Sequence, residues 1–224
     1  MKYLKKFETD SDVQMYILPN VVLVEDTDTV LYNTLKEGVF IQHIDGTTYT
    51  TDEWTASGFT NEQANGVAVV TPECSFVIAK NYIGAYDRWT KTTKLIDGVV
   101  TTQDSSAARL DYAGVSNTAV LASIEGNVQL NDCAAYRCVN YEFPDGKKGY
   151  LPSAGEAIIA IQNTDAIREA MTTIGGEELT TSMIWTSTQA SASDAWIWYW
   201  NTGITTMSKN GGGNSIKTLA FASL

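Results

Sequence analysis

The chain has 224 residues, of which 44% are hydrophobic and 18% charged, a composition typical of a folded domain with a substantial apolar core. Its formal net charge of −11 repels phosphate groups, which argues against binding to nucleic acids or anionic membranes. No segment approaches the ~18 consecutive apolar residues that a membrane span requires. The basic start, Met1–Lys6, is followed by the acidic segment Phe7–Asp12, so we expect a chain made in the cytoplasm without a signal peptide.

Residues 1–36 form a separate unit in the sequence pattern. A short helix that begins near Thr9 is followed by strand-like segments at 21–24 and 29–32, joined by an acidic turn. A helix and a hairpin bury too little apolar surface to fold firmly alone. We therefore expect an attachment or oligomerisation module, followed by one main domain at 37–224.

The first part of the main domain is predicted to be a series of short strands. Val39–Ile44, Gly66–Val70 and Ser75–Ala79 are apolar runs bounded by turn residues, which favours strands. The stretch Tyr82–Gln103 mixes a tryptophan and many threonines with charges, which suits a hairpin or a long exposed loop.

Helices are predicted next. Asn131–Val139 has apolar residues on one side, and Ser153 with Glu156 forms a capping box ahead of a helix with a buried isoleucine stripe. A further helix is expected to start at a capped Thr164 and to stop at Gly175-Gly176. The mixture predicts an α+β fold in which helices pack on short mixed or antiparallel sheets joined by many loops.

The three cysteines and the single histidine indicate no disulfide framework and no metal centre. Cys74, Cys133 and Cys138 form an odd set without CxxC spacing, and a separation of five places the last two on different helix faces. Buried free thiols are the expectation. His43 has no second histidine for a zinc site and no partner set for a catalytic triad, so a hydrogen-bonded strand position is expected.

The last segment, Ala190–Leu224, differs from the rest of the chain. It contains one aspartate, two lysines and no glutamate, a net charge of +1 against −12 for the remainder. Tryptophan occupies every second position from Trp196 to Trp200, so a strand would place three indoles on one face and Ile197 and Tyr199 on the other. Small and polar residues fill the positions between and after them.

Several motifs together carry a resemblance to a known family. They are Gly149–Glu156 (GYLPSAGE), Ile184–Gln189 (IWTSTQ), Ala195-Trp196, and Ile216-Lys217 leading into Leu219–Ala222. Their joint spacing, over residues 120 to 224, resembles the C-type-lectin-fold variable proteins of diversity-generating retroelements in phages and prophages of gut Bacteroides-type bacteria. The first 36 residues are similar to a short N-terminal module of gut-phage structural proteins.

The resemblance implies a C-type-lectin-like fold with a variable region at about 184–216. This family diversifies by substitution at template adenines, typically in AAY codons, which yields residues such as Asn, Ser, Thr, Asp, Gly, Ala, Ile, Val and Tyr. It does not yield Trp, Lys, Met, Glu or Gln. Between Ala190 and Ser215 the residues outside that set are Trp196, Trp198, Trp200, Met207 and Lys209. The tryptophans are then scaffold.

The remaining positions form the expected ligand-binding surface. They are Ile184, Ala190, Ser191, Ser193, Asp194, Ile197, Tyr199, Thr202, Ile204, Thr205, Thr206, Asn210, Gly211, Gly212, Gly213, Asn214 and Ser215. Of these only Tyr199 offers the large amphipathic area of a binding hot spot. The alternative is that 190–194 and 210–215 are solvated loops without a ligand.

Two rival classes are weighed against this interpretation. Calcium-dependent sugar binding needs clustered oxygen ligands, and the EPN, QPD and WND tripeptides of sugar-binding lectins are absent, so no metal or cofactor is expected. Sulfatase-activating enzymes share the broad fold but need a cysteine pair near the C-terminus, and no cysteine follows Cys138. Asp145, Glu156, Glu177 and Glu178 are better explained as turn, cap and surface charges, so we expect no enzyme.

The resemblance favours a receptor-binding protein of a phage or prophage tail or fibre. Its partners would be a protein or glycan of the host cell surface and other components of the virion tail. Homo-oligomers, trimers in particular, are expected because repetition turns weak single contacts into avidity. The alternative is a bacterial cell-surface adhesin or pilus-tip protein with the same fold.

Overall fold

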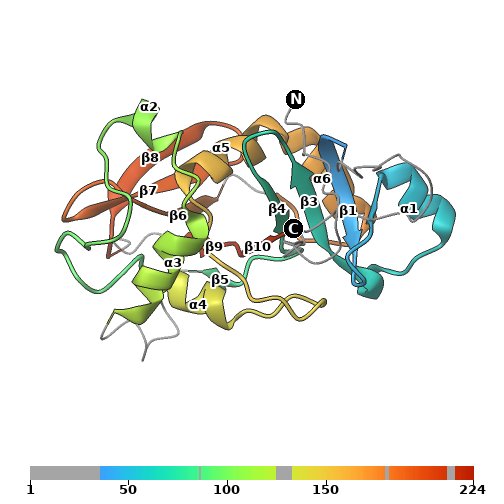
Figure 1. Cartoon of the computed structure of the whole chain (residues 1–224), viewed down its shortest axis with the longest axis horizontal. Helices are drawn as coiled ribbons and strands as arrows, with labels where there is room; N and C mark the ends of the chain where they lie inside the picture. Colours follow the sequence, from blue (N-terminus) through green and yellow to red (C-terminus); the bar gives the residue numbers. More distant parts are fainter. Residues whose placement is uncertain (1–35, 86, 125–132, 180–181, 211–214) are drawn as a thin grey trace, which may run out of the picture. The chain divides into compact units, whose positions relative to one another are not determined.

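The computed structural model describes residues 36–85, 87–124, 133–179, 182–210 and 215–224 (Figure 1). Within these ranges the chain forms six α-helices, one 3-10 helix and ten strands, arranged in two five-stranded sheets. The expected α+β class is therefore confirmed. The expected N-terminal module lies outside the described residues except for Lys36. In the described part of the chain, no helix is long and apolar enough to cross a membrane.

The first sheet has the strand order β10-β4-β3-β1-β2, and all its strand pairs are antiparallel. Its strands are β1 (Gly38–His43), β2 (Thr48–Tyr49), β3 (Ala64–Val70), β4 (Ser75–Ile78) and β10 (Phe221–Ser223). The three strands predicted for this part of the chain are confirmed. Every residue of β3 is buried, so this central strand is covered on both faces.

Two helices and a 3-10 turn accompany the first sheet. They are α1 (Thr51–Ser57), η1 (Asn61–Gln63) and α6 (Thr164–Thr173), and α6 packs against β1 and β3. The expected helix start at Thr164 is confirmed, but the N-cap residue is Asn163, whose side chain makes no capping hydrogen bond. The Thr164 hydroxyl lies within hydrogen-bond distance of the carbonyls of Ile161 and Trp200, at 2.7 Å and 2.9 Å. The expected stop is correct, since Gly175 has a φ of +66°.

The second sheet has the order β5-β9-β6-β7-β8, with β6 and β9 parallel and the other pairs antiparallel. Its strands are β5 (Gly84–Ala85), β6 (Met183–Gln189), β7 (Asp194–Tyr199), β8 (Gly203–Ser208) and β9 (Ile216–Thr218). The accompanying helices are α2 (Ser105–Ala108), α3 (Gly114–Ser123), α4 (Ala134–Asn140) and α5 (Ala154–Gln162). The predicted capping box at the start of α5 is confirmed, and α5 packs against β6, β7 and β8.

The stretch Tyr82–Gln103 is not the exposed loop or hairpin that its composition suggested. Apart from β5 it is irregular, yet the side chains of Trp89, Ile96 and Val99 are buried in the core. Trp89 donates its indole hydrogen bond to the carbonyl of Thr186 on β6, at 2.7 Å. The loop therefore packs against the second sheet and buries residues of β6.

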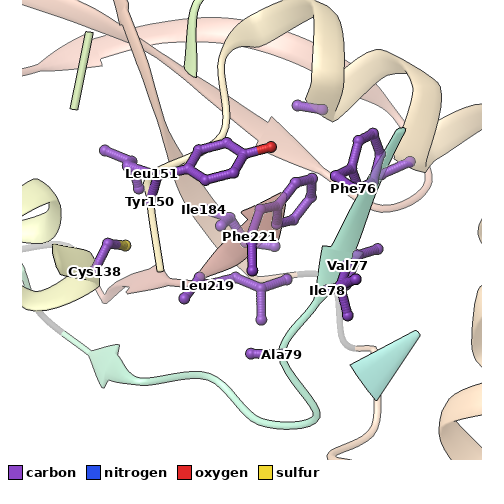
Figure 2. Packing of buried hydrophobic residues seen from close by; sticks show 14 of the residues in the cluster. Phe76, Val77, Ile78, Ala79, Cys138, Tyr150, Leu151, Ile184, Leu219 and Phe221 are labelled. Atoms are coloured by element: carbon purple, nitrogen blue, oxygen red, sulfur yellow. The ribbon is translucent and has the colours of Figure 1, made fainter. Parts of the chain in front are cut away.

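The C-terminal residues join the two sheets. The motif Ile216-Lys217 leading into Leu219–Ala222 is divided between the sheets: β9 belongs to the second sheet and β10 to the first, with only Leu219 and Ala220 between them. In Figure 2, Phe221 lies between Phe76 of β4 and Tyr150, with ring centroids 4.6 Å and 6.3 Å away. The segment that follows the expected variable region is thus fixed in the common core.

Candidate ligand-binding surface

The three alternating tryptophans lie inside the protein, as expected of scaffold residues. Trp196, Trp198 and Trp200 are 4%, 0% and 1% exposed. Trp196 donates its indole hydrogen bond to the carbonyl of Thr102, and Trp200 donates to the hydroxyl of Tyr82, each at 2.9 Å. Trp198 and Trp200 pack edge to face with ring centroids 4.5 Å apart.

Three of the expected contact residues are buried and do not belong to the surface. Ile184 and Ile197 are fully buried and Ala190 nearly so. The alternation of side chains along β7 is present, but it does not separate a core face from a solvent face, because both faces are covered. Trp185, which pairs with Ile197, donates its indole hydrogen bond to the carbonyl of Asp87 in the covering loop, at 2.9 Å.

The turn between β6 and β7 presents three of the expected residues in a fixed arrangement. The hydroxyls of Ser191 and Ser193 both donate hydrogen bonds to Oδ2 of Asp194, at 2.9 Å and 2.6 Å. The backbone N–H groups of Ser193 and Asp194 donate to Oγ of Ser191. Ser193 is exposed, and the other two side chains are half-buried. These hydrogen bonds hold the turn in one conformation before any ligand binds.

Strand β8 carries the most exposed part of the expected surface. Thr205 and Thr206 are exposed, as is Thr202 in the preceding turn, whereas Ile204 is half-buried against Trp196. Tyr199, the only large candidate contact, is half-buried and packs on the core. The exposed area of β8 is thus made of small hydroxyl side chains.

A buried lysine holds the end of β8. Lys209 is fully buried; its ammonium donates hydrogen bonds to the carbonyl of Lys94 and to Oε1 of Gln189, at 2.9 Å and 2.6 Å. It also lies over the ring of Trp89, 4.9 Å from the centroid. Burial lowers the pKa of Lys209 to about 8, an effect that the charge of Asp194 partly offsets. The lysine fixes the point from which the following loop departs.

The residues after Lys209 are described only at both ends of the loop. Asn210 and Ser215 are exposed. Gly211, Gly212, Gly213 and Asn214 lie outside the described residues, so their expected role stays a prediction.

The described contact residues gather at two ends of the second sheet and along one edge. Asp194 pairs with Ser208 at one end, and Tyr199 pairs with Gly203 at the other. These ends are separated by the length of β8, about 17 Å at ~3.4 Å per residue. A small ligand cannot contact both ends at once, and β8 is the element that connects them.

An ion pair with a buried carboxylate, which sequence reasoning missed, anchors β9 behind this surface. Asp87 is 1% exposed and accepts two-pronged hydrogen bonds from the guanidinium of Arg137, at 2.8–3.1 Å. Thr218 of β9 donates its hydroxyl hydrogen bond to the same carboxylate. The two charged residues are separated by 50 positions, so no local pattern signals the contact.

Two further buried acids accept hydrogen bonds from neighbouring segments. The carboxylate of Asp111 accepts hydrogen bonds from the hydroxyl of Thr188 and the side-chain amide of Asn117, at 2.5 Å and 3.0 Å. Glu156 accepts from Ser153 and from the hydroxyl of Tyr150, at 2.7 Å and 2.9 Å, and burial raises the pKa of its carboxyl. These acids accept hydrogen bonds from backbone, amide and hydroxyl donors within the fold, which explains their burial.

Within the described ranges, no group of three or more His, Cys, Asp or Glu side chains is arranged to hold a metal ion. The three cysteines are free thiols, with Cys133 and Cys138 buried as expected and Cys74 half-buried. Burial raises the pKa of the Cys74 thiol to about 12, so little reactive thiolate forms at neutral pH.

Comparisons with family models, curated proteins and solved structures return no significant match. The interpretation of the surface therefore depends on its own residues and geometry.

Proposed function

We propose that this chain is a ligand-binding protein with a C-type-lectin-like domain that displays a hypervariable surface. In this proposal it is a receptor-binding protein of a phage or prophage tail or fibre, diversified by a retroelement. Its ligand is a protein or glycan of the bacterial cell surface, and it catalyses no reaction.

The observation that carries the proposal is that, in the segment from Ala190 to Ser215, buried and exposed positions hold different residue types. Residues that substitution of AAY codons cannot produce are turned inward: the three tryptophans and Lys209 are buried, and Met207 is half-buried against the core. The exposed described residues all belong to the set that it can produce: Ala192, Ser193, Asn201, Thr202, Thr205, Thr206, Ser208, Asn210 and Ser215.

This division suits a surface that changes while its scaffold persists. Substitution of an exposed residue away from special features changes the free energy of unfolding by about 0.5 kcal/mol or less. Loss of a buried tryptophan costs roughly 3–5 kcal/mol. Variation confined to the outward positions would therefore leave the fold intact. Display in several copies, as in a trimeric fibre, would strengthen weak single contacts.

The neighbouring DNA tests the proposal. We expect a reverse-transcriptase gene and a near-copy of the stretch that encodes Trp185–Leu224, differing from it at adenines. A phage structural operon around the gene would support the tail or fibre assignment. An export or lipoprotein signal in the full reading frame would instead support the cell-surface adhesin. Absence of both the reverse transcriptase and the repeat would contradict diversification.

A binding assay tests the receptor role independently. The purified chain, added in excess, is expected to compete with the phage for adsorption to its host. Purified chain in which Thr202, Thr205 and Thr206 are all replaced by Lys serves as the control and is expected to compete poorly. Equal competition by both chains would show that this surface does not bind the receptor.

A further inference from the structure

Strand β8 is a long and regular sheet edge. It is the last strand of the second sheet and pairs with β7 without any shift of register over all six residues. The other three sheet edges are the strands β2, β5 and β10, which have only two or three residues each. Among the described residues, β8 is thus the only edge long enough to accept a whole additional strand.

The register identifies which backbone groups of β8 are available. The N–H of Lys209 donates to the carbonyl of Ser193 at 2.9 Å, which makes Asp194 and Ser208 a pair without mutual hydrogen bonds. Because paired and unpaired positions alternate, the N–H and C=O groups of Ile204, Thr206 and Ser208 point away from β7. No other described segment pairs with them.

Within the described residues, the sequence of β8 itself lacks the features that usually discourage strand addition. Natural edge strands carry lysine, proline or a bulge that discourages pairing. The sequence of β8, Gly-Ile-Thr-Thr-Met-Ser, has no charged residue and no proline. Of the three residues whose backbone groups point away from β7, Thr206 and Ser208 are also exposed to solvent. Threonine and isoleucine favour extended backbone, so the edge is ready to pair.

We propose that the ligand contacts β8 as an extended, non-acidic peptide segment of a protein, which adds a sixth strand to the second sheet. This inference rests on the proposed function and narrows its ligand class from protein or glycan to protein. The outward groups repeat at every second residue, a spacing that a peptide backbone matches and a glycan does not. A second copy of this chain fits less well at this edge, because both copies carry a net charge of −11; the oligomers expected from the sequence would form through residues 1–36 instead.

Strand addition explains how a variable surface retains a partner. The backbone of β8 supplies hydrogen bonds that no side-chain substitution removes, apart from proline. The exposed side chains of Thr205, Ser193 and Asn210 at and around the edge then determine which peptide sequence is preferred.

The experiment uses the full chain as bait for a displayed library of random linear peptides. Enriched peptides are synthesised together with versions that carry N-methyl groups at alternate amides. The variant Thr206→Pro removes an outward N–H but no bond to β7, a position where an edge strand tolerates proline. The control Thr206→Val changes the same side chain and keeps the N–H. Thermal unfolding checks that both variants are folded.

We expect the enriched peptides to be poor in Asp and Glu and to bind wild type and Thr206→Val within about threefold of each other. Thr206→Pro and peptide N-methylation are each expected to weaken binding at least about tenfold, which is ~1.4 kcal/mol. Hydrogen exchange should show new protection at the amides of Ile204, Thr206 and Ser208 on binding.

Three results would overturn the inference: no enriched peptide that protects these amides, equal binding to Thr206→Pro, or protection that depends only on the concentration of this chain. The last result would identify a second copy as the occupant. If Thr206→Pro still competes for host adsorption like wild type, strand addition fails while the receptor role stands. If wild type itself does not compete, the receptor role fails.

Discussion

The scaffold role of the tryptophans predicts a large loss of stability when Trp198 is replaced by alanine. Trp198 is fully buried, and its ring packs against Trp200 and Phe221 with centroids 4.5 Å and 6.4 Å away. Removing the indole loses its transfer free energy and leaves a cavity at the junction of the two sheets. The expected cost is roughly 3–5 kcal/mol, a large part of the ~5–15 kcal/mol that a domain has.

The assay is guanidinium-induced unfolding monitored by circular dichroism. The free energies of unfolding of wild type and variant are compared with a shared m-value, the slope of that free energy against denaturant concentration. The melting temperature should fall by about 10 °C, given ~2–4 °C per kcal/mol for a domain of this size. The matched control is Thr205→Ala, on the exposed part of β8, with an expected change of about 0.5 kcal/mol or less. A cost below about 1 kcal/mol for Trp198→Ala, or an equal cost for the two variants, would refute the division into scaffold and surface.

Three further predictions concern the supports of this surface. The pKa of Lys209 is about 8 in the folded chain and 10.5 ordinarily, so the unfolded state binds more protons between these values. The free energy of unfolding of wild type should therefore rise with pH from 8 to 10.5 relative to Lys209→Met, and a flat difference would contradict the burial of the charge. Arg137→Met leaves the buried Asp87 carboxylate unpaired and should cost about 3 kcal/mol in urea unfolding, with partial recovery in the double variant with Asp87→Asn. Gly66→Ala places a methyl group against the backbone carbonyl of Ile78 on β4 and should lower stability by roughly 1–3 kcal/mol; an unchanged melting temperature would contradict this packing.

Local signals account for the parts of the fold that could be predicted from the sequence. The strands β1, β3 and β4 are apolar runs between turn residues, and α5 begins with the Ser153–Glu156 capping box. The same signal is present at Thr50 and Glu53, where the side chains and backbone bond reciprocally, and it would have predicted α1. Helix α3 has little amphipathic pattern, so it lacked such a signal.

Long-range packing explains what the sequence did not reveal. Ile197 was expected at the surface because alternation assigns it to the face opposite the tryptophans, but the loop that contains Asp87 and Trp89 covers the sheet there. The division of residues 216–223 into β9 and β10 depends on the strands with which each part pairs. The eight residues alone do not contain that information. The ion pair of Asp87 with Arg137 depends on tertiary contacts in the same way.

The most direct measurement of the central claim is the sequence of this gene in independent isolates. Amino-acid differences are expected to gather at exposed positions of β8 and its flanking turn, such as Thr202, Thr205 and Thr206, while Trp198 and Lys209 stay unchanged. Differences spread evenly along the chain, or as frequent at Trp198 and Lys209 as on β8, would contradict a variable binding surface on a constant scaffold.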